Sequence, residues 1–285
     1  MSDESTAALQ PPPLPNPITP APAKPVAKWR WTIHLTLMAA LPVIAGFAGA
    51  ASKNKGPAIP NDVRALLVVC AFELLFVAIP YGLAWLASRA TVDDLLLRWR
   101  PTHWVFPLGA IYSVAIRLAM GVVFLVCVGV VLASGKASMD QIKAFIEVHR
   151  PQVEKLVDTG AMQWNSAYFW LNATLVSLVV GGLREELWRS SFLAGLRALW
   201  PRAFGSQGGS IAAAAVAALF FGVGHLPQGI LGASIITVVG FFLGVIMTQH
   251  KSIWPAVIAH GLFDATSMAL LPIAMEMQKA QHLGG

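Results

Sequence analysis

Long apolar runs separated by short polar segments cover most of this chain. Runs of about 20 residues match the length of a transmembrane α-helix, and they lack the alternation of apolar and polar residues that marks a transmembrane β-strand. The sequence therefore predicts an all-α fold, a polytopic membrane helical bundle of seven or eight transmembrane segments. The clearest runs lie at 31–50, 64–88, 104–133, 209–226, 230–249 and 253–275.

One further apolar stretch is too long for a single crossing. It begins near Ser166 and leads directly into a polar sequence that ends near residue 200. An α-helix of that length would span about 50 Å at 1.5 Å per residue, whereas the hydrocarbon core of a bilayer is about 30 Å thick. We therefore expect the helix to break or re-enter near Gly181 and Gly182.

The apolar runs and the polar segments between them divide the chain into four parts. Residues 1–28 are rich in proline, which predicts a disordered N-terminal tail. Residues 29–165 hold the first membrane helices and a polar helical connector that breaks near Pro151. Residues 166–275 form a membrane core that contains the candidate catalytic residues, and residues 276–285 form a C-terminal tail.

Composition agrees with a membrane protein and narrows its partners. The chain is 56% hydrophobic and 12% charged, about half the charged fraction of an ordinary soluble domain. Its net charge is +6, but the basic residues flank apolar runs instead of forming a basic stripe with interleaved aromatics. This pattern excludes nucleic acid as a partner and predicts membrane lipid instead. Cys70 and Cys127 lie within apolar runs and indicate no disulfide framework.

Ionisable residues interrupt the apolar sequence at three places. A charge or an unpaired imidazole in a bilayer costs several kcal/mol, so such residues usually face a protein interior and mark chemistry or transport. Arg189 can reach either preceding carboxylate, because helix residues three or four apart are neighbours. His260 and Asp264 share one helix face for the same reason. The candidate catalytic residues are Glu185, Glu186, His225, His260 and Asp264.

These residue types are sufficient for hydrolysis if they converge. A carboxylate can accept a proton from water, and imidazoles can hold the water and the developing oxyanion. Two histidines and a carboxylate could instead bind Zn²⁺, with His225, His260 and Glu185 as ligands. The sequence lacks the HExxH motif, and these residues come from three segments. We therefore favour a site without a metal or other cofactor and keep Zn²⁺ as the alternative.

The order of the motifs resembles a known family. Two adjacent glutamates followed by an arginine, then FxxxH, then HxxxD on successive membrane helices, are similar to the CAAX-protease and bacteriocin-processing (CPBP, Abi) family of intramembrane proteases. That family is related to the Ras-converting CAAX prenyl endopeptidase. The resemblance covers about residues 166–270.

The resemblance also implies a role for each motif residue. It implies that Glu185 activates the water, with Glu186 as the second carboxylate, and that His225 polarises the water or the substrate carbonyl. His260 and Asp264 complete the site, and Arg189 is the structural partner of the carboxylates. The family spacing is EExxxR, whereas this chain reads EExxR and has Ser190 at the family's arginine position.

Three other polar residues lie in the predicted helices. Glu73 falls in the second run and Arg117 in the third; they could form an ion pair between these helices, or each could instead snorkel to the membrane surface or line the cavity. His34 lies near the start of the first run, where we expect an interfacial and not a catalytic side chain. Gly240 and Gly244 form a GxxxG motif, which predicts close helix packing within this chain.

The leading hypothesis is an intramembrane endopeptidase in a bacterial cell membrane. It would hydrolyse a membrane-associated peptide or protein in CAAX-type, leader or C-terminal sorting-signal processing, through a water activated by Glu185. Two alternatives stay open: a non-catalytic membrane scaffold or immunity protein on the same fold, and a proton or metal-ion carrier. The sequence does not define an oligomeric state.

Overall fold

The computed structural model describes residues 26–52, 60–149 and 156–283. Within these residues the protein is helical and contains no strand. Seven helical segments are long and apolar enough to cross a membrane, which confirms the predicted all-α polytopic bundle. Residues 1–25 of the predicted tail, and Pro151 in the connector, lie outside the described residues.

The seven segments follow the predicted runs closely. They are α1 (Lys28–Ala51), α2 (Val63–Ser88), α3 (Val105–Ala133, preceded by the short η1, Thr102–Trp104), the continuous α6–η3–α7 (Ser166–Leu171, Asn172–Arg184 and Glu185–Leu199), α9 (Gln207–Gly224), α10 (Ile230–His250) and α11 (Trp254–Leu283). In the described parts of the connections, four shorter helices lie between them: α4 (Met139–His149), α5 (Ala161–Trp164), α8 (Pro201–Phe204) and η4 (Leu226–Gln228). The last long helix runs through most of the segment that was predicted as a C-terminal tail.

Helix ends are defined by local capping. The side chain of Asp62 accepts a hydrogen bond from the Ala65 amide at 2.8 Å, and Ser206 accepts one from Gly209 at 3.0 Å. These side chains satisfy amides that have no partner in the first turn of α2 and α9. Arg89 and Lys251 adopt left-handed conformations directly after α2 and α10, which ends both helices.

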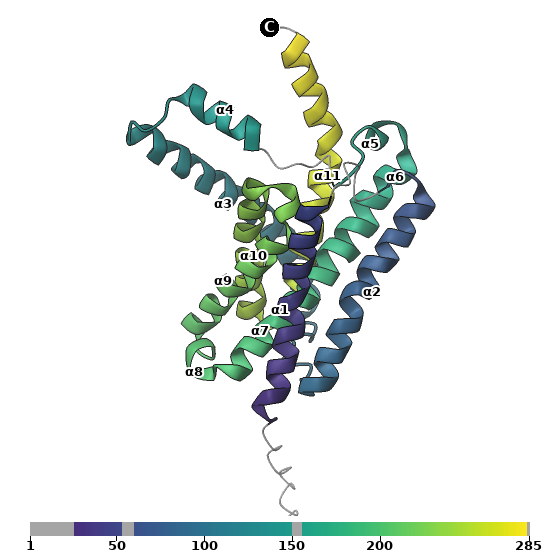
Figure 1. Cartoon of the computed structure of the whole chain (residues 1–285), viewed down its shortest axis with the longest axis vertical. Helices are drawn as coiled ribbons and strands as arrows, with labels where there is room; N and C mark the ends of the chain where they lie inside the picture. The colour runs from purple at the N-terminus through teal and green to yellow at the C-terminus, as the bar shows by residue number, and fades with distance from the viewer. Residues whose placement is uncertain (1–25, 53–59, 150–155, 284–285) are drawn as a thin grey trace, which may run out of the picture.

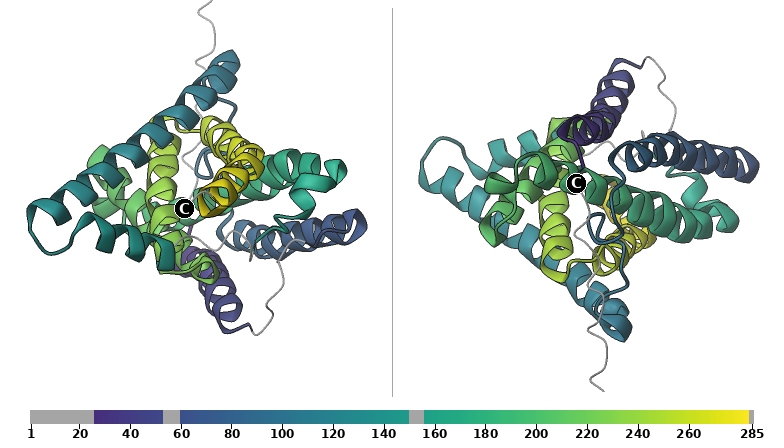
Figure 2. Two further views of the ribbon diagram at one scale, coloured as in Figure 1. Left: turned by 90° about the horizontal axis from the view of Figure 1, so that it is seen from above. Right: turned by 90° about the horizontal axis from the view of Figure 1, so that it is seen from below.

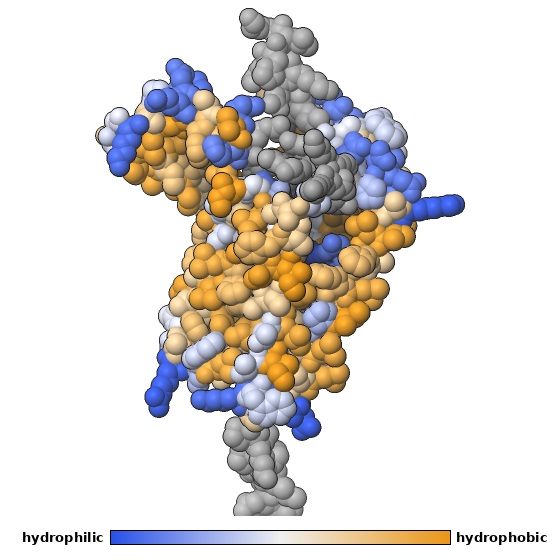
Figure 3. All heavy atoms as spheres, viewed as in Figure 1, coloured by the Kyte–Doolittle hydropathy of each residue, from blue (hydrophilic) through white to orange (hydrophobic). Residues whose placement is uncertain are grey.

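The helices form an inner bundle with a less buried periphery. α11 packs against η3 and α3, while α9 packs against α10 and α1. In the most apolar 18-residue stretch of the α3 segment, 6% of the residues are buried within the protein, compared with 44% in α10. α2 and the α3–α4 pair extend outward in different directions around α10 and α11 (Figure 2). On the face shown in Figure 3, viewed as in Figure 1, an apolar band crosses the bundle and hydrophilic residues gather toward its two ends.

The predicted break near Gly181 and Gly182 is wrong. The helix stays continuous, and the thirteen residues of η3 adopt π-helical geometry before α-helical geometry resumes at Glu185. A π-helix has more residues per turn and a smaller rise, so the segment is shorter than an α-helix with the same number of residues. The two glycines instead allow α11 to approach: a Cβ on Gly181 would lie 2.5 Å from Asp264 Oδ2, and one on Gly182 would lie 2.8 Å from the Val257 carbonyl oxygen.

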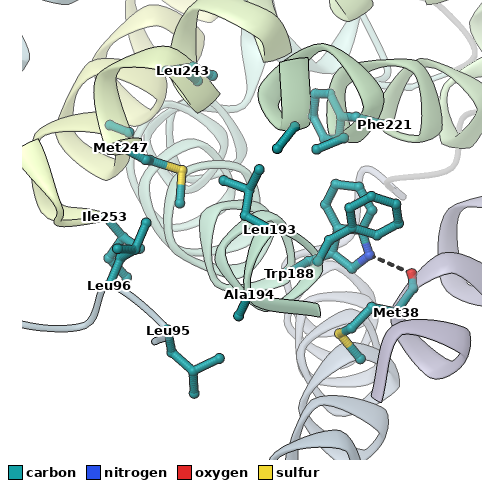
Figure 4. Packing of buried hydrophobic residues seen from close by; sticks show 14 of the residues in the cluster. Met38, Leu95, Leu96, Trp188, Leu193, Ala194, Phe221, Leu243, Met247 and Ile253 are labelled. Carbon is teal, nitrogen blue, oxygen red and sulfur yellow. Dashed lines mark hydrogen bonds between the residues drawn. The ribbon is translucent and has the colours of Figure 1, made fainter. Parts of the chain in front are cut away.

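The helix that carries the two glutamates is anchored by an apolar core. Trp188 donates a 2.8 Å hydrogen bond from Nε1 to the Met38 carbonyl oxygen, which links α7 to α1 (Figure 4). Leu193 and Phe192 on α7 are almost completely buried among residues of α9, α10 and the 95–96 loop. The GxxxG prediction is confirmed, because Gly240 and Gly244 place α10 directly against Phe221 and Ala214 of α9.

Candidate active site

The structure brings the five predicted catalytic residues together. Glu185 and Glu186 begin α7, His225 follows the last residue of α9, and His260 and Asp264 lie one turn apart on α11. Adjacent helix residues point about 100° apart, so the two carboxylates face different surroundings. Glu186 is completely buried, whereas the side chain of Glu185 is 13% exposed.

Glu186 forms the interior of the site. It makes a fully buried ion pair with Arg189, one turn further along α7. The guanidinium of Arg189 also lies over the ring of Phe221, 4.3 Å from the ring centroid. Glu186 Oε1 accepts a second hydrogen bond from His260 Nδ1 at 2.9 Å. A buried carboxylate with two such donors is compensated electrostatically and held in one orientation.

His260 connects the two carboxylates. An ionised carboxylate can only accept, so Nδ1 of His260 carries the hydrogen toward Glu186. This leaves Nε2 facing the site, 3.6 Å from Glu185 Oε2 and 3.5 Å from Asp264 Oδ2. The imidazole is therefore oriented by one carboxylate and presented to two others.

His225 lies nearest to the other oxygen of the Glu185 carboxylate. Its Nδ1 donates to the Phe221 carbonyl oxygen at 2.9 Å, because a backbone carbonyl can only accept. The ring packs edge to face on Phe221, with centroids 4.6 Å apart. Its Nε2 lies 4.0 Å from Glu185 Oε1. The Glu185 carboxylate thus lies between the Nε2 atoms of two histidines whose Nδ1 atoms are both occupied.

Two further charged residues, Arg184 and Glu73, lie beside these five and are not part of the sequence motifs. Arg184 donates from Nη2 to Glu185 Oε1 at 2.8 Å and from Nη1 to Glu73 on α2. Of the alternatives that the sequence left open, the ion pair between Glu73 and Arg117 is therefore not formed, and Glu73 lies beside the site. Arg117 donates instead to the Ser113 and Phe263 carbonyl oxygens at 3.0 and 2.6 Å, joining α3 to α11. The sequence signal for Arg184 was its position directly before the paired glutamates.

The unusual arginine spacing does not remove the contact between arginine and carboxylate. Arg189 reaches Glu186 from three positions along the helix, which places both on one face. Ser190 is also buried and donates to the Leu187 carbonyl oxygen at 2.8 Å. Arg189 lies one position earlier than the arginine of the family spacing, and its guanidinium still pairs with the buried carboxylate of Glu186.

His34 lies outside this site and is not interfacial as predicted. It is completely buried where α1, α2 and α7 meet. Nδ1 lies 2.9 Å from Ser88 Oγ, and Nε2 lies 2.8 Å from Ser191 Oγ. The first helix packs against α2, α7 and α9, so a polar residue near its start is enclosed by its neighbours.

The comparison with known families covers the same part of the chain. Residues 166–266 match the family model of type II CAAX prenyl endopeptidase Rce1-like proteins. The predicted resemblance is confirmed over this segment, which contains all six motif residues. No curated protein and no solved structure matches the chain. The match supports a protease of the CAAX type, a hydrolase, within a multi-pass membrane protein.

Residues 166–266, the Rce1-like segment, include the side chains that a metal would need, but one of them, Glu185, already pairs with an arginine. Among the residues that the structure describes, no three His, Cys, Asp or Glu side chains are arranged to hold a metal ion. The guanidinium of Arg184 binds Glu185 Oε1 at 2.8 Å, so a fixed positive charge already neutralises the carboxylate that the alternative Zn²⁺ site would use. Arg184 occupies only one oxygen of Glu185, so Oε2 and the Nε2 atoms of the two histidines are the donors that the alternative Zn²⁺ site would use.

Proposed function

We propose that this protein is an intramembrane endopeptidase that hydrolyses a peptide bond through a water activated by Glu185. The observation that carries the proposal is the position of the Glu185 carboxylate, 4.0 Å from His225 Nε2 and 3.6 Å from His260 Nε2. Both separations are too long for a direct hydrogen bond, so a water that contacts the carboxylate and an imidazole can complete the link between them.

The reaction assigns different work to the groups around that water. Glu185 takes a proton from the water while the water oxygen forms a bond to the substrate carbonyl carbon. The carbon–nitrogen bond of the peptide then breaks, and the proton passes from Glu185 to the leaving amine. The Nδ1–H of His225 is already donated to a backbone carbonyl, so His225 acts here in its doubly protonated, cationic form, and its Nε2–H donates to the oxyanion that forms between these steps.

Exposure distinguishes the two histidines. The side chain of His225 is 21% exposed and that of His260 is 6% exposed. We therefore assign contact with the substrate carbonyl to His225. His260, held by Glu186 and facing Asp264, orients the water and the Glu185 carboxylate. Glu186 and Arg189 support this arrangement without contacting the substrate.

The surroundings of the site favour a substrate that is already in the membrane. The site lies on helices that cross the apolar band, so a peptide must reach it from the lipid or from the membrane surface. We propose a membrane-associated peptide or protein of a bacterial cell membrane, cleaved in CAAX-type, leader or C-terminal sorting-signal processing.

The first test uses purified protein in lipid nanodiscs and a quenched fluorescent peptide that ends in a farnesylated CAAX sequence. Membrane-anchored peptides without the prenyl group serve as additional probes. We expect the wild type to cleave at least one probe, and His225→Ala to lower kcat by about 10²–10³-fold, because it removes an oxyanion donor. The control is His103→Ala, which changes an exposed histidine on η1 and should retain wild-type activity. Full activity of His225→Ala would exclude its assigned role.

A second test concerns the metal. Dialysis of the nanodisc-bound enzyme against a strong zinc chelator is expected to leave its rate unchanged, because protein groups alone activate the water in this proposal. Activity that is lost on chelation and restored by Zn²⁺ would instead favour the alternative site formed by His225, His260 and Glu185.

A further inference from the structure

We propose that Glu73, on the second membrane helix, is a positioning residue for the water-activating carboxylate and acts on it through Arg184. This inference rests on the proposed function and extends it to a helix outside the Rce1-like segment. Three side chains carry it. Glu73 comes from α2, Arg184 from the last residue of η3, and Glu185 from the first residue of α7.

Glu73 needs an explanation because of where it lies. It is an acidic residue within a strongly apolar helix, and its side chain is 39% exposed. A carboxylate at membrane depth is costly unless a cation accompanies it. Arg184 is that cation: its Nη1 binds Glu73, and the Arg184 side chain is 17% exposed.

Arg184 is shared between two carboxylates and not devoted to one. Nη1 binds Glu73 while Nη2 donates to Glu185 Oε1 at 2.8 Å. A guanidinium is planar and its donors have fixed directions, so fixing one end of the group fixes the other. Glu73 therefore determines where Nη2 points, and through it the orientation of the Glu185 carboxylate.

The consequence for catalysis follows from which oxygen is held. Arg184 binds Oε1, which leaves Oε2 directed at His260 Nε2, 3.6 Å away. Without Glu73 the guanidinium is free to turn and bind both oxygens of Glu185. Its carboxylate would then move away from the two histidines, and the turnover step would slow although the substrate still binds.

The test compares variants of the full-length protein in nanodiscs with the same fluorescent peptide. We expect Glu73→Gln to lower kcat about tenfold with KM within about twofold, since Glu73 does not touch substrate. Arg184→Gln should lower kcat further, and the double variant should be no worse than Arg184→Gln alone, because the two act in one chain. The matched control is Leu75→Gln, which places the same amide on an exposed position of α2 and should leave kcat unchanged.

A charge exchange separates positioning from simple attachment of α2. Glu73→Arg combined with Arg184→Glu restores an ion pair between α2 and η3, but the new glutamate cannot donate to Glu185. We expect thermal stability to recover while kcat stays as low as in Arg184→Gln. Recovery of kcat in the exchanged protein, or wild-type kcat in Glu73→Gln, would overturn the proposal.

A readout without substrate keeps this inference distinct from the proposed function. The infrared bands of the Glu185 carboxylate are isolated by subtracting the spectrum of Glu185→Gln from that of the wild type. In the Glu73→Gln background these bands should shift, because the hydrogen bond from Arg184 changes. Unchanged bands would overturn the coupling even if the protein hydrolysed every probe, and shifted bands would support it even if it hydrolysed none.

Discussion

Glu185→Gln is expected to lower kcat by at least about 10³-fold while KM changes little, because Gln has nearly the same shape but cannot take a proton from water. The amide can still contact Arg184, so the helix start should stay in place. The measurement is the rate of cleavage of the fluorescent peptide in nanodiscs, with size-exclusion profile and melting temperature as folding checks.

The control for this prediction is a second Glu→Gln exchange. Glu147 is exposed on α4, so Glu147→Gln should cleave at the wild-type rate. A Glu185→Gln protein that cleaves at more than about a tenth of the wild-type rate would remove Glu185 as the general base, since a base of this kind contributes about 10²–10⁴-fold.

Arg189→Met is expected to destabilise the fold by about 3–5 kcal/mol, the range for breaking a buried ion pair by removing one partner. Glu186 would be left completely buried with only His260 as a donor, and the contact over the Phe221 ring would be lost. The free energy of unfolding can be measured in a bilayer or bicelle by trapping the unfolded state with bulky binding tags.

The companion variant removes both charges. Arg189→Met combined with Glu186→Gln leaves no uncompensated carboxylate, so it should recover most of the stability that Arg189→Met loses. If Arg189→Met alone unfolded with the wild-type free energy, the ion pair would not be the structural support that its complete burial indicates.

The fold could be predicted because its main signal is local. Apolar runs of membrane-spanning length determine where α1, α2 and α3 begin and end, to within a few residues. The convergence of Glu185, His225 and His260 was also predictable, since charged or polar groups within membrane helices are costly unless they pair with one another. Helical spacing indicated which of them share a face.

The partners of polar side chains on neighbouring helices could not be predicted from local sequence. Glu73 pairs with Arg184 and not with Arg117, and His34 is enclosed where an interfacial position was expected. These outcomes depend on how helices distant in sequence pack and rotate, which no local pattern encodes. The glycine pair at 181–182 was similarly ambiguous: glycine both weakens a helix and permits close approach, and here the approach of α11 decides.

The origin of the oxygen in the product shows whether a water activated by Glu185 attacks the peptide bond. Purified protein in nanodiscs is incubated with the farnesylated CAAX peptide in H₂¹⁸O, and the new carboxyl terminus is analysed by mass spectrometry. The wild type should yield a product with one ¹⁸O atom at the cleavage site, and Glu185→Gln should yield no such product. Equal amounts of labelled product from both proteins would contradict this mechanism, and so would no product from the wild type with any of the membrane-associated probes.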